Sequence, residues 1–321
     1  MDHPESMGEL ERQMAERTPS PPADLSAVKE RLGRVGVWLM TAISEVRAEE
    51  ELRGAAVIEE LGYSTYWFGE GPNTREAFTH AAVLLCGTKR LHVATGIANI
   101  FGRDAVAAAN GANTLADAWP GRFMMGLGVS HAPLVKPRGH EYSKPVATMR
   151  TYLEALDVTE FGPPLPERPP RLLAALRGAM LRLAATRAQG AHTYFVPPEH
   201  TARAREVLGP EPILAPEQAV VLETDPDRAR AAAREYARFY LALPNYLNNL
   251  RELGFSDSDF ENGGSDALID AVVCWGDADA IAERVRAHHE AGADHVCIQP
   301  IADTFAQQVD HLRSLAPALT A

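Results

Sequence analysis

The sequence has 321 residues, of which 46% are hydrophobic and 23% are charged, and this balance is that of an ordinary globular protein. Its formal charge of -12 argues against a nucleic acid as partner, because basic surface supplies most of the affinity for a phosphate backbone. The three cysteines are far apart and in no metal-binding spacing, and no apolar run is long enough for a membrane span or a signal peptide, so we expect a cytoplasmic protein with no metal.

The first 23 residues contain Pro19, Pro21 and Pro22 and hardly an apolar side chain. Such a segment cannot bury enough apolar surface to fold alone, so we predict a disordered or loosely packed arm. Residues 24–321 are predicted to form a single domain, and its first element is a short amphipathic helix from Asp24 to about Gly33.

Eight short apolar stretches, rich in β-branched and aromatic residues, are predicted to be strands. In chain order they cover residues 34–40, 64–68, the run from 91, 123–129, 171–176, 191–196, 217–223 and 294–300. The helices between and after them cover residues 46–61, 74–87, an alanine-rich segment after 99, 144–158, 179–189, a segment from 197, 225–243, 277–291 and 305–315. The helices have one polar face, and His288 and His289 are expected on the surface.

Strands separated by helices pair in parallel, and a (β/α)8 TIM barrel needs roughly 250 residues. The pattern therefore favours a TIM barrel, with a long loop at 132–144 and an insertion at about 244–270. An open doubly wound sheet is the alternative. It would usually carry a glycine-rich turn after its first strand, where Thr41-Ala42-Ile43-Ser44 stands.

Small and polar residues end two neighbouring strands. The third strand runs into Thr95-Gly96-Ile97-Ala98-Asn99, and the fourth ends in Gly126-Leu127-Gly128-Val129-Ser130-His131. Because the active sites of barrels lie at the carboxyl ends of the strands, both stretches are expected at one site.

Several motifs together resemble the luciferase-like monooxygenase superfamily over about residues 34–316. They are TGIAN (95–99), PGRFMMGLGVSH (120–131), VPPEHTARAREVLG (196–209), GD (276–277) and AGADHVCIQ (291–299). The sequence looks most like the branch that uses coenzyme F-420 (F420), an 8-hydroxy-5-deazaflavin. This resemblance implies a barrel of the bacterial luciferase type and a homodimer.

The resemblance also implies site residues. A bulge with a non-prolyl cis peptide at Gly96-Ile97 would back the ring of the cofactor, although a plain strand with a glycine remains the alternative. Asn99 would bond the pyrimidine edge of the ring or serve as a turn residue. The loop Leu176-Arg177-Gly178-Ala179-Met180 would bind the cofactor phosphate through the amides of a helix N-terminus, with Arg177 adding a charge or facing solvent.

The same resemblance suggests two catalytic residues. Glu70 stands where relatives have an acidic residue touching the flavin, and His131 stands where they place a proton donor; imidazole titrates in the right range for that role. His131 is otherwise a loop residue. The next position after Glu70 often holds a catalytic histidine and is Gly71 here. Weaker candidates for lining the pocket are Trp38, His140 and Tyr142.

We therefore expect an oxidoreductase that transfers a hydride between coenzyme F420 and an unidentified small organic substrate. The cofactor carries the difficult step, and the protein supplies position, charge and a proton. An FMN-dependent monooxygenase on the same fold is the first alternative, and a non-catalytic cofactor-binding barrel, favoured by Gly71, is the second. The arginines expected to hold an anionic cofactor tail are Arg103, Arg138 and Arg177.

Overall fold

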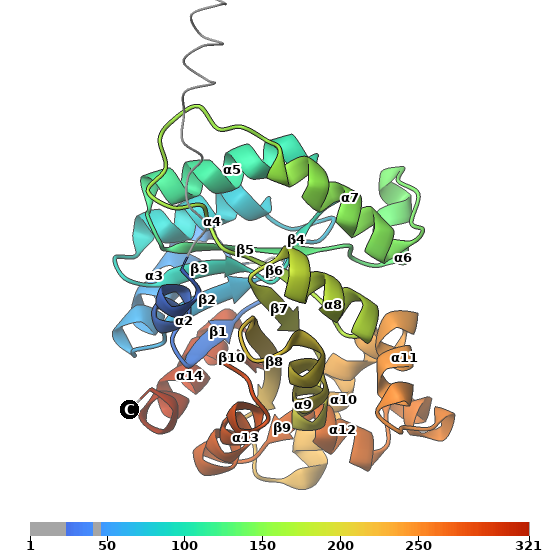
Figure 1. Cartoon of the computed structure of the whole chain (residues 1–321). Helices are drawn as coiled ribbons and strands as arrows, with labels where there is room; N and C mark the ends of the chain where they lie inside the picture. Colours follow the sequence, from blue (N-terminus) through green and yellow to red (C-terminus); the bar gives the residue numbers. More distant parts are fainter. Residues whose placement is uncertain (1–23, 41–45, 321) are drawn as a thin grey trace, which may run out of the picture.

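The computed structural model describes residues 24–40 and 46–320, so the predicted arm at 1–23 lies outside the described residues. Parallel strands form a closed barrel inside a ring of helices (Figure 1). Around the ring the strands are β1 (Val35–Trp38), β2 (Thr65–Phe68), β3 (His92–Thr95), β5 (Phe123–Gly128), β6 (Arg171–Ala174), β7 (Gly190–Thr193), β8 (Ile213–Val221) and β10 (Val296–Pro300). The ring closes because β10 pairs with both β1 and β8. The predicted TIM barrel is confirmed, and an open sheet is excluded.

Helices cover the outside of the barrel, and α2 lies before the first strand. They are α2 (Leu25–Leu32), α3 (Ala48–Glu60), α4 (Ala77–Gly87), α5 (Ala105–Ala118), α7 (Pro145–Asp157), α8 (Gly178–Arg187), α9 (Pro198–Leu208), α10 (Pro226–Leu241), α13 (Ala278–Glu290) and α14 (Phe305–Leu319). Several begin at a carboxylate that accepts a bond from a first-turn amide, as Asp104 does for α5 and Asp225 for α10. Within the described residues no helix is both long and apolar enough to cross a membrane.

The structure departs from the predicted elements in three places. Strand β8 begins at Ile213, four positions before the predicted start at Glu217. The loop at 132–144 contains α6 (Ala132–Val135) and a short 3-10 helix, Lys136–Arg138. The insertion holds α11 (Pro244–Glu252), a 3-10 segment (Asp257–Gly263) and α12 (Asp266–Val272), after which comes an unpredicted strand, β9 (Val273–Trp275), that pairs with β8.

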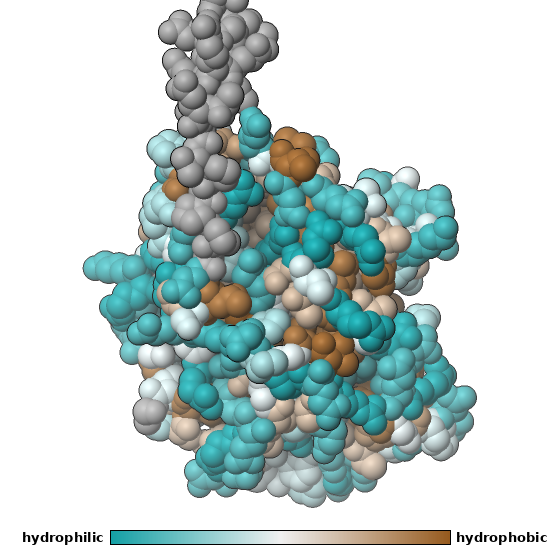
Figure 2. Space-filling view, viewed as in Figure 1, coloured by the Kyte–Doolittle hydropathy of each residue, from teal (hydrophilic) through white to brown (hydrophobic). Residues whose placement is uncertain are grey.

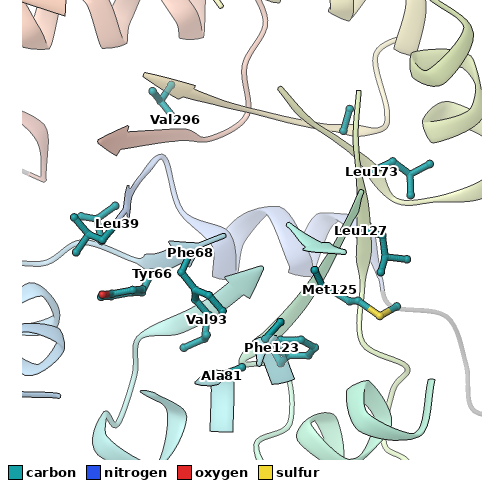
Figure 3. Packing of buried hydrophobic residues seen from close by; sticks show 14 of the residues in the cluster. Leu39, Tyr66, Phe68, Ala81, Val93, Phe123, Met125, Leu127, Leu173 and Val296 are labelled. Carbon is teal, nitrogen blue, oxygen red and sulfur yellow. The ribbon is translucent and has the colours of Figure 1, made fainter. Parts of the chain in front are cut away.

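Alternate residues of each strand face opposite sides of the barrel wall. On β5, Phe123, Met125 and Leu127 point outward into the main core between strands and helices, whereas Met124 points inward. Figure 3 shows the outward side chains of several strands converging on one cluster. Each large apolar side chain buried in this way contributes about 1.5–3 kcal/mol to folding.

The prediction that His288 lies on the surface is wrong. Its ring is fully buried, with Nδ1 2.8 Å from the Thr201 hydroxyl and Nε2 2.9 Å from Gln218 Oε1. The residue stands three and seven positions after Val285 and Ile281, both buried, so helical spacing places it on the inner face of α13. His289, one position on, is partly buried.

Candidate active site

The mouth of the barrel is built on its uppermost inward-facing layer. The interior cluster includes Trp38, Ala94, Met124, Leu172, Ala215 and Cys297. Strand alternation places the residues two positions further along five of these strands in the next inward-facing layer. These residues are Gly96, Gly126, Ala174, Glu217 and Gln299. The layer is therefore lined by very small residues on β5, on β6 and directly after β3, and by polar residues on β8 and β10.

The bulge after β3 contains a cis peptide bond between Gly96 and Ile97, as the resemblance implies. Both residues are partly exposed. The side chain of Ile97 lies over the glycines of β5, where a Cβ added to Gly128 would overlap it. After the bulge, β4 (Ala98–Asn99) pairs with the end of β5. The glycines of the GLG sequence in β5 thus make room for the bulge at the mouth of the barrel.

Two buried polar atoms lie directly behind Gly96. Trp38 Nε1 and His192 Nε2 are both within 3.1 Å of the position that a Cβ on Gly96 would occupy, and neither has a hydrogen-bond partner among the described residues. His192 Nδ1 lies 2.7 Å from Ala215 O, and burial lowers the pKa of this histidine to about 4. At neutral pH the ring is uncharged, so Nδ1 donates to that carbonyl and Nε2 is a free acceptor.

Glu70 supports the bulge from its outer side. Its Oε2 accepts a hydrogen bond from the Asn99 amide (2.8 Å), and its Oε1 accepts one from Ala77 N (3.3 Å) and forms an ion pair with Arg103. Arg103 also pairs with Glu76 at 2.7 Å. Both oxygens of Glu70 are engaged, and Arg103, expected at the cofactor tail, is held by two carboxylates. The catalytic role of Glu70 stays a prediction.

Asn99 is buried beside the bulge, and its Oδ1 accepts a hydrogen bond from Phe101 N at 3.0 Å. This geometry agrees with the alternative prediction that Asn99 serves as a turn residue. The loop at 132–144 returns to this point, because the rings of His140 and Tyr142 lie 5.5 and 6.2 Å from that of Phe101. The structure therefore brings the weaker pocket candidates close to the bulge.

His131 stands at the start of α6 and faces the insertion. Its ring centroid is 5.4 Å from that of Tyr246 in α11, and burial lowers its pKa, so the ring is neutral at physiological pH. Tyr246 contacts Phe195 and Tyr240, at 5.7 and 5.2 Å between ring centroids. Figure 2 shows the surface indented between the lobe that holds α6 and the lobe that holds α11. His131 and Tyr246 link these two lobes.

The predicted phosphate loop forms the start of α8. Arg177 is the N-cap, and its carbonyl accepts the amides of Met180 and Leu181, which leaves those of Gly178 and Ala179 without helical partners. Gly178 is partly exposed and Ala179 exposed. Arg177 is itself exposed and lies 3.4 Å from Glu252 of α11, which matches its solvent-facing alternative.

A basic groove lies beside this loop, between α7 and α8. Its volume is about 390 Å³, and it is lined by Val146, Arg150, Ala179, Arg182, Leu183, Thr186 and Arg187. Arg187 pairs with Asp157 at 2.8 Å. Arg150 and Arg182 have no carboxylate partner within the part of the chain that the structure describes, and a Cβ on Gly178 would touch Arg182 at 3.0 Å. The groove is thus continuous with the free amides of α8.

Sequence reasoning missed the polar group that closes the layer opposite the bulge. It consists of Glu217 and Gln299 on barrel strands, Tyr194 just after β7, and Tyr236 and Tyr240 on α10. The hydroxyl of Tyr194 donates to Gln299 Oε1 (2.6 Å), lies 2.8 Å from that of Tyr240 and accepts from that of Tyr236 (3.1 Å). The available signal was Glu217-Gln218 inside an otherwise apolar stretch, Ile213–Val221.

No group of three or more His, Cys, Asp or Glu side chains in the described residues could hold a metal ion.

A family model described as luciferase-like monooxygenase matches residues 32–295. A 5,10-methylenetetrahydromethanopterin reductase of Methanolobus tindarius is 24% identical over 102 residues, which are 32% of this chain and 31% of that protein. The match thus spans about a third of the length of this curated relative.

Solved structures of similar fold include enzymes with either cofactor. An F420-dependent secondary alcohol dehydrogenase in complex with an F420-acetone adduct has a TM-score of 0.71 at 16% identity, over 90% of this chain and 99% of that chain. A type II Baeyer-Villiger monooxygenase of Pseudomonas putida in complex with FMN has a TM-score of 0.66 at 16% identity, over 90% and 99%. At these identities the likeness shows the fold.

Proposed function

The chain belongs to the luciferase-like monooxygenase family, and from that premise we propose that it is an oxidoreductase that transfers a hydride between coenzyme F420 and a small organic substrate. The observation that carries this proposal is the partly exposed bulge at Gly96-Ile97, which lies at the carboxyl ends of the barrel strands. That is the end where barrel enzymes bind substrates and cofactors.

The residues at the mouth fit a flat ring. Gly96, Gly126 and Ala174 leave one side of the uppermost layer without bulk, and the partly exposed bulge can contact one face of a tricyclic system. Tyr194 and Gln299 supply hydroxyl and amide groups on the opposite side. A bound deazaflavin would donate or accept a hydride at the carbon that replaces the central ring nitrogen of a flavin.

The protein has three tasks in this proposal. The bulge, held in place by Glu70, orients the ring. The neutral imidazole of His131 contacts the substrate and orients it by a hydrogen bond. The first-turn amides of α8 bind the cofactor phosphate, because helix N-termini favour anions, and the groove with Arg150 and Arg182 takes the anionic tail.

The comparisons include F420-dependent enzymes, which support F420 as the cofactor. One similar structure is an F420-dependent alcohol dehydrogenase, and the curated relative is a methylenetetrahydromethanopterin reductase. The FMN-bound Baeyer-Villiger monooxygenase makes an FMN-dependent monooxygenase the second candidate. The predicted homodimer and cytoplasmic location stay predictions.

Tryptophan fluorescence can test the proposal, because Trp38 lies directly behind Gly96. Titration with F420 should quench the fluorescence of the wild-type protein. Trp38→Phe should lose part of this quenching, whereas Trp275→Phe, a change on β9 outside the barrel ring, should retain it. Saturable quenching by FMN alone would favour the second candidate, and quenching by neither cofactor would overturn both.

A further inference from the structure

Glu217 is a carboxylic acid in the middle of a barrel strand. It is the fifth residue of β8, is 1% exposed, and pairs in register with Cys297 of β10. Ile213 and Ala215, four and two positions earlier, belong to the interior cluster. Strand alternation therefore places the carboxyl group of Glu217 inside the barrel, in the layer that also contains Gly96.

The contacts of this carboxyl group are few. Its Oε2 accepts a hydrogen bond from Phe195 N at 3.1 Å, whereas its Oε1 has no partner among the described residues. The titratable groups that face it are Tyr194 beyond β7, Tyr236 and Tyr240 on α10, Tyr246 on α11 and Cys297 on β10. None of them is a cation, so no positive charge offsets the cost of burying a carboxylate.

The environment therefore favours the protonated acid. Burial raises the pKa of Glu217 from its ordinary value of 4.5 to about 8, and the hydrogen bond from Phe195 N moderates this rise. At neutral pH the group carries a proton that it can release within the range in which enzymes operate.

A chain of hydroxyl groups leads from Glu217 towards the bulge. The Tyr236 hydroxyl interacts electrostatically with the carboxyl group of Glu217 and donates to the hydroxyl of Tyr194 at 3.1 Å. The ring of Tyr194 packs edge-on against Trp38, with centroids 5.1 Å apart, and Trp38 lies behind Gly96. Tyr194 is the member of this chain that packs against Trp38, so its hydroxyl is the end of the chain on the side of the bulge.

We propose that Glu217 stores the proton for the reaction at the bulge and exchanges it with the substrate through the hydroxyl groups of Tyr236 and Tyr194. This inference rests on the proposed hydride transfer. It also points to a substrate class, a small molecule with a polarised carbon-oxygen or carbon-nitrogen double bond, because the heteroatom of such a bond needs a proton when the carbon receives a hydride.

The step balances as follows for a carbonyl substrate. Its carbon accepts a hydride from the reduced deazaflavin, which becomes oxidised, and the electron pair of the π bond moves to the oxygen. That oxygen takes the hydroxyl proton of Tyr194, competing with Gln299 as acceptor. Tyr194 takes a proton from Tyr236, which takes one from Glu217, and the resulting carboxylate regains a proton from solvent. Oxidation of an alcohol runs the same steps in reverse.

Infrared spectroscopy of the protein without cofactor tests the proton store. A carboxylic acid C=O stretch should be present at pH 7 and titrate near pH 8 in the wild type. It should be missing in Glu217→Gln and retained in Glu223→Gln, a control change of the same chemistry at a carboxylate that pairs with Arg228 beyond the end of β8. Absence of a protonated carboxyl group at pH 7 in the wild type would overturn the inference.

Single-turnover kinetics with F420 tests the relay. Glu217→Gln and Tyr236→Phe should each slow hydride transfer on the order of 100-fold and remove the limb of the pH profile near 8, with F420 affinity unchanged. Tyr236→Phe should keep the infrared band, so it remains informative if Glu217→Gln does not fold. Wild-type rates and pH profiles in both variants would overturn the relay. A wild type that exchanges no hydride with F420 would instead overturn the proposed function, while the infrared titration still decides the state of Glu217.

Discussion

Glu217 should also leave a signature in the stability of the protein. Its pKa is about 8 in the folded state and near 4.5 when exposed, so the folded protein holds the proton between these values while the unfolded chain loses it. The stabilising effect of the neutral acid is complete below pH 4.5 and is lost as the pH rises through about 8. The total loss is about 5 kcal/mol.

The corresponding prediction concerns Glu217→Gln, which removes the ionisation but keeps an acceptor for the Phe195 amide. Relative to the wild type, the variant should gain free energy of unfolding steadily from pH 5 to pH 8 and show no further change above about pH 9. Urea denaturation at a series of pH values measures this difference. A difference that does not depend on pH would mean that Glu217 is not protonated in the folded state.

A second residue-scale prediction concerns His131. Its neutral ring at the mouth contacts Tyr246, so His131→Ala should lower the rate of hydride transfer on the order of 100-fold and leave the dissociation constant for F420 unchanged. The control is His311→Ala on α14, which should keep the wild-type rate. Unchanged turnover in His131→Ala would assign this histidine to the loop alone.

Residues next to strand ends were predictable, and those linked through tertiary structure were not. The position of Gly96-Ile97 followed from its motif, because a motif fixes the local backbone. The engagement of Arg103 by Glu70 and Glu76 joins segments about 30 residues apart, and Glu217 depends on helix α10 covering a barrel strand. No local pattern reports such contacts, so a free Arg103 was expected and the acid was overlooked.

At the scale of elements, the bulge and β5 form one packing unit. The Ile97 side chain occupies the space that a Cβ on Gly128 would need. Gly128→Ala should therefore push Ile97 aside, destabilise the fold by about 1–3 kcal/mol and weaken F420 binding, because the surface of the bulge changes. Thermal unfolding and fluorescence titration measure the two effects.

The double variant Gly128→Ala, Ile97→Ala provides the control for this prediction. Removing the Ile97 side chain empties the space that the new methyl group enters, so the two changes should be less destabilising together than the sum of the single changes. Strict additivity would show that the two side chains do not compete, and would contradict the packing described here.

The predicted start of strand β8 was wrong because proline can stand either at the boundary of a strand or within it. Strand β8 begins at Ile213 and contains Pro216, which pairs with Thr193 of β7. Proline usually marks the boundary of a strand, so the sequence alone favours a start at Glu217. With that start Glu217 is expected at the end of the strand, whereas the structure places it in the middle of β8, facing the interior of the barrel. The eight-strand ring was predictable because alternating strands and helices leave few topologies open.

At the scale of the whole molecule, charge is distributed unevenly. The chain carries a formal charge of -12, yet the groove between α7 and α8 contains Arg150 and Arg182 without carboxylate partners in the described part of the chain. Long-range repulsion by an acidic protein opposes an anionic ligand, so local positive charge is required wherever such a ligand binds. Composition could not reveal this groove, because it lies between two separate helices.

Replacing both groove arginines by glutamine should weaken F420 binding about 10-fold, since exposed ion pairs contribute roughly 0.2–1 kcal/mol each. The loss should shrink as salt screens the charges. The isolated deazaflavin ring with its ribityl chain, which lacks phosphate and anionic tail, should bind both proteins equally. Arg286→Gln and Arg313→Gln, on α13 and α14, should bind F420 like the wild type. Equal losses of affinity for the isolated ring and for F420 would contradict this prediction. The two arginines would then affect the binding of the ring, and the anionic tail of the cofactor would lie outside the groove.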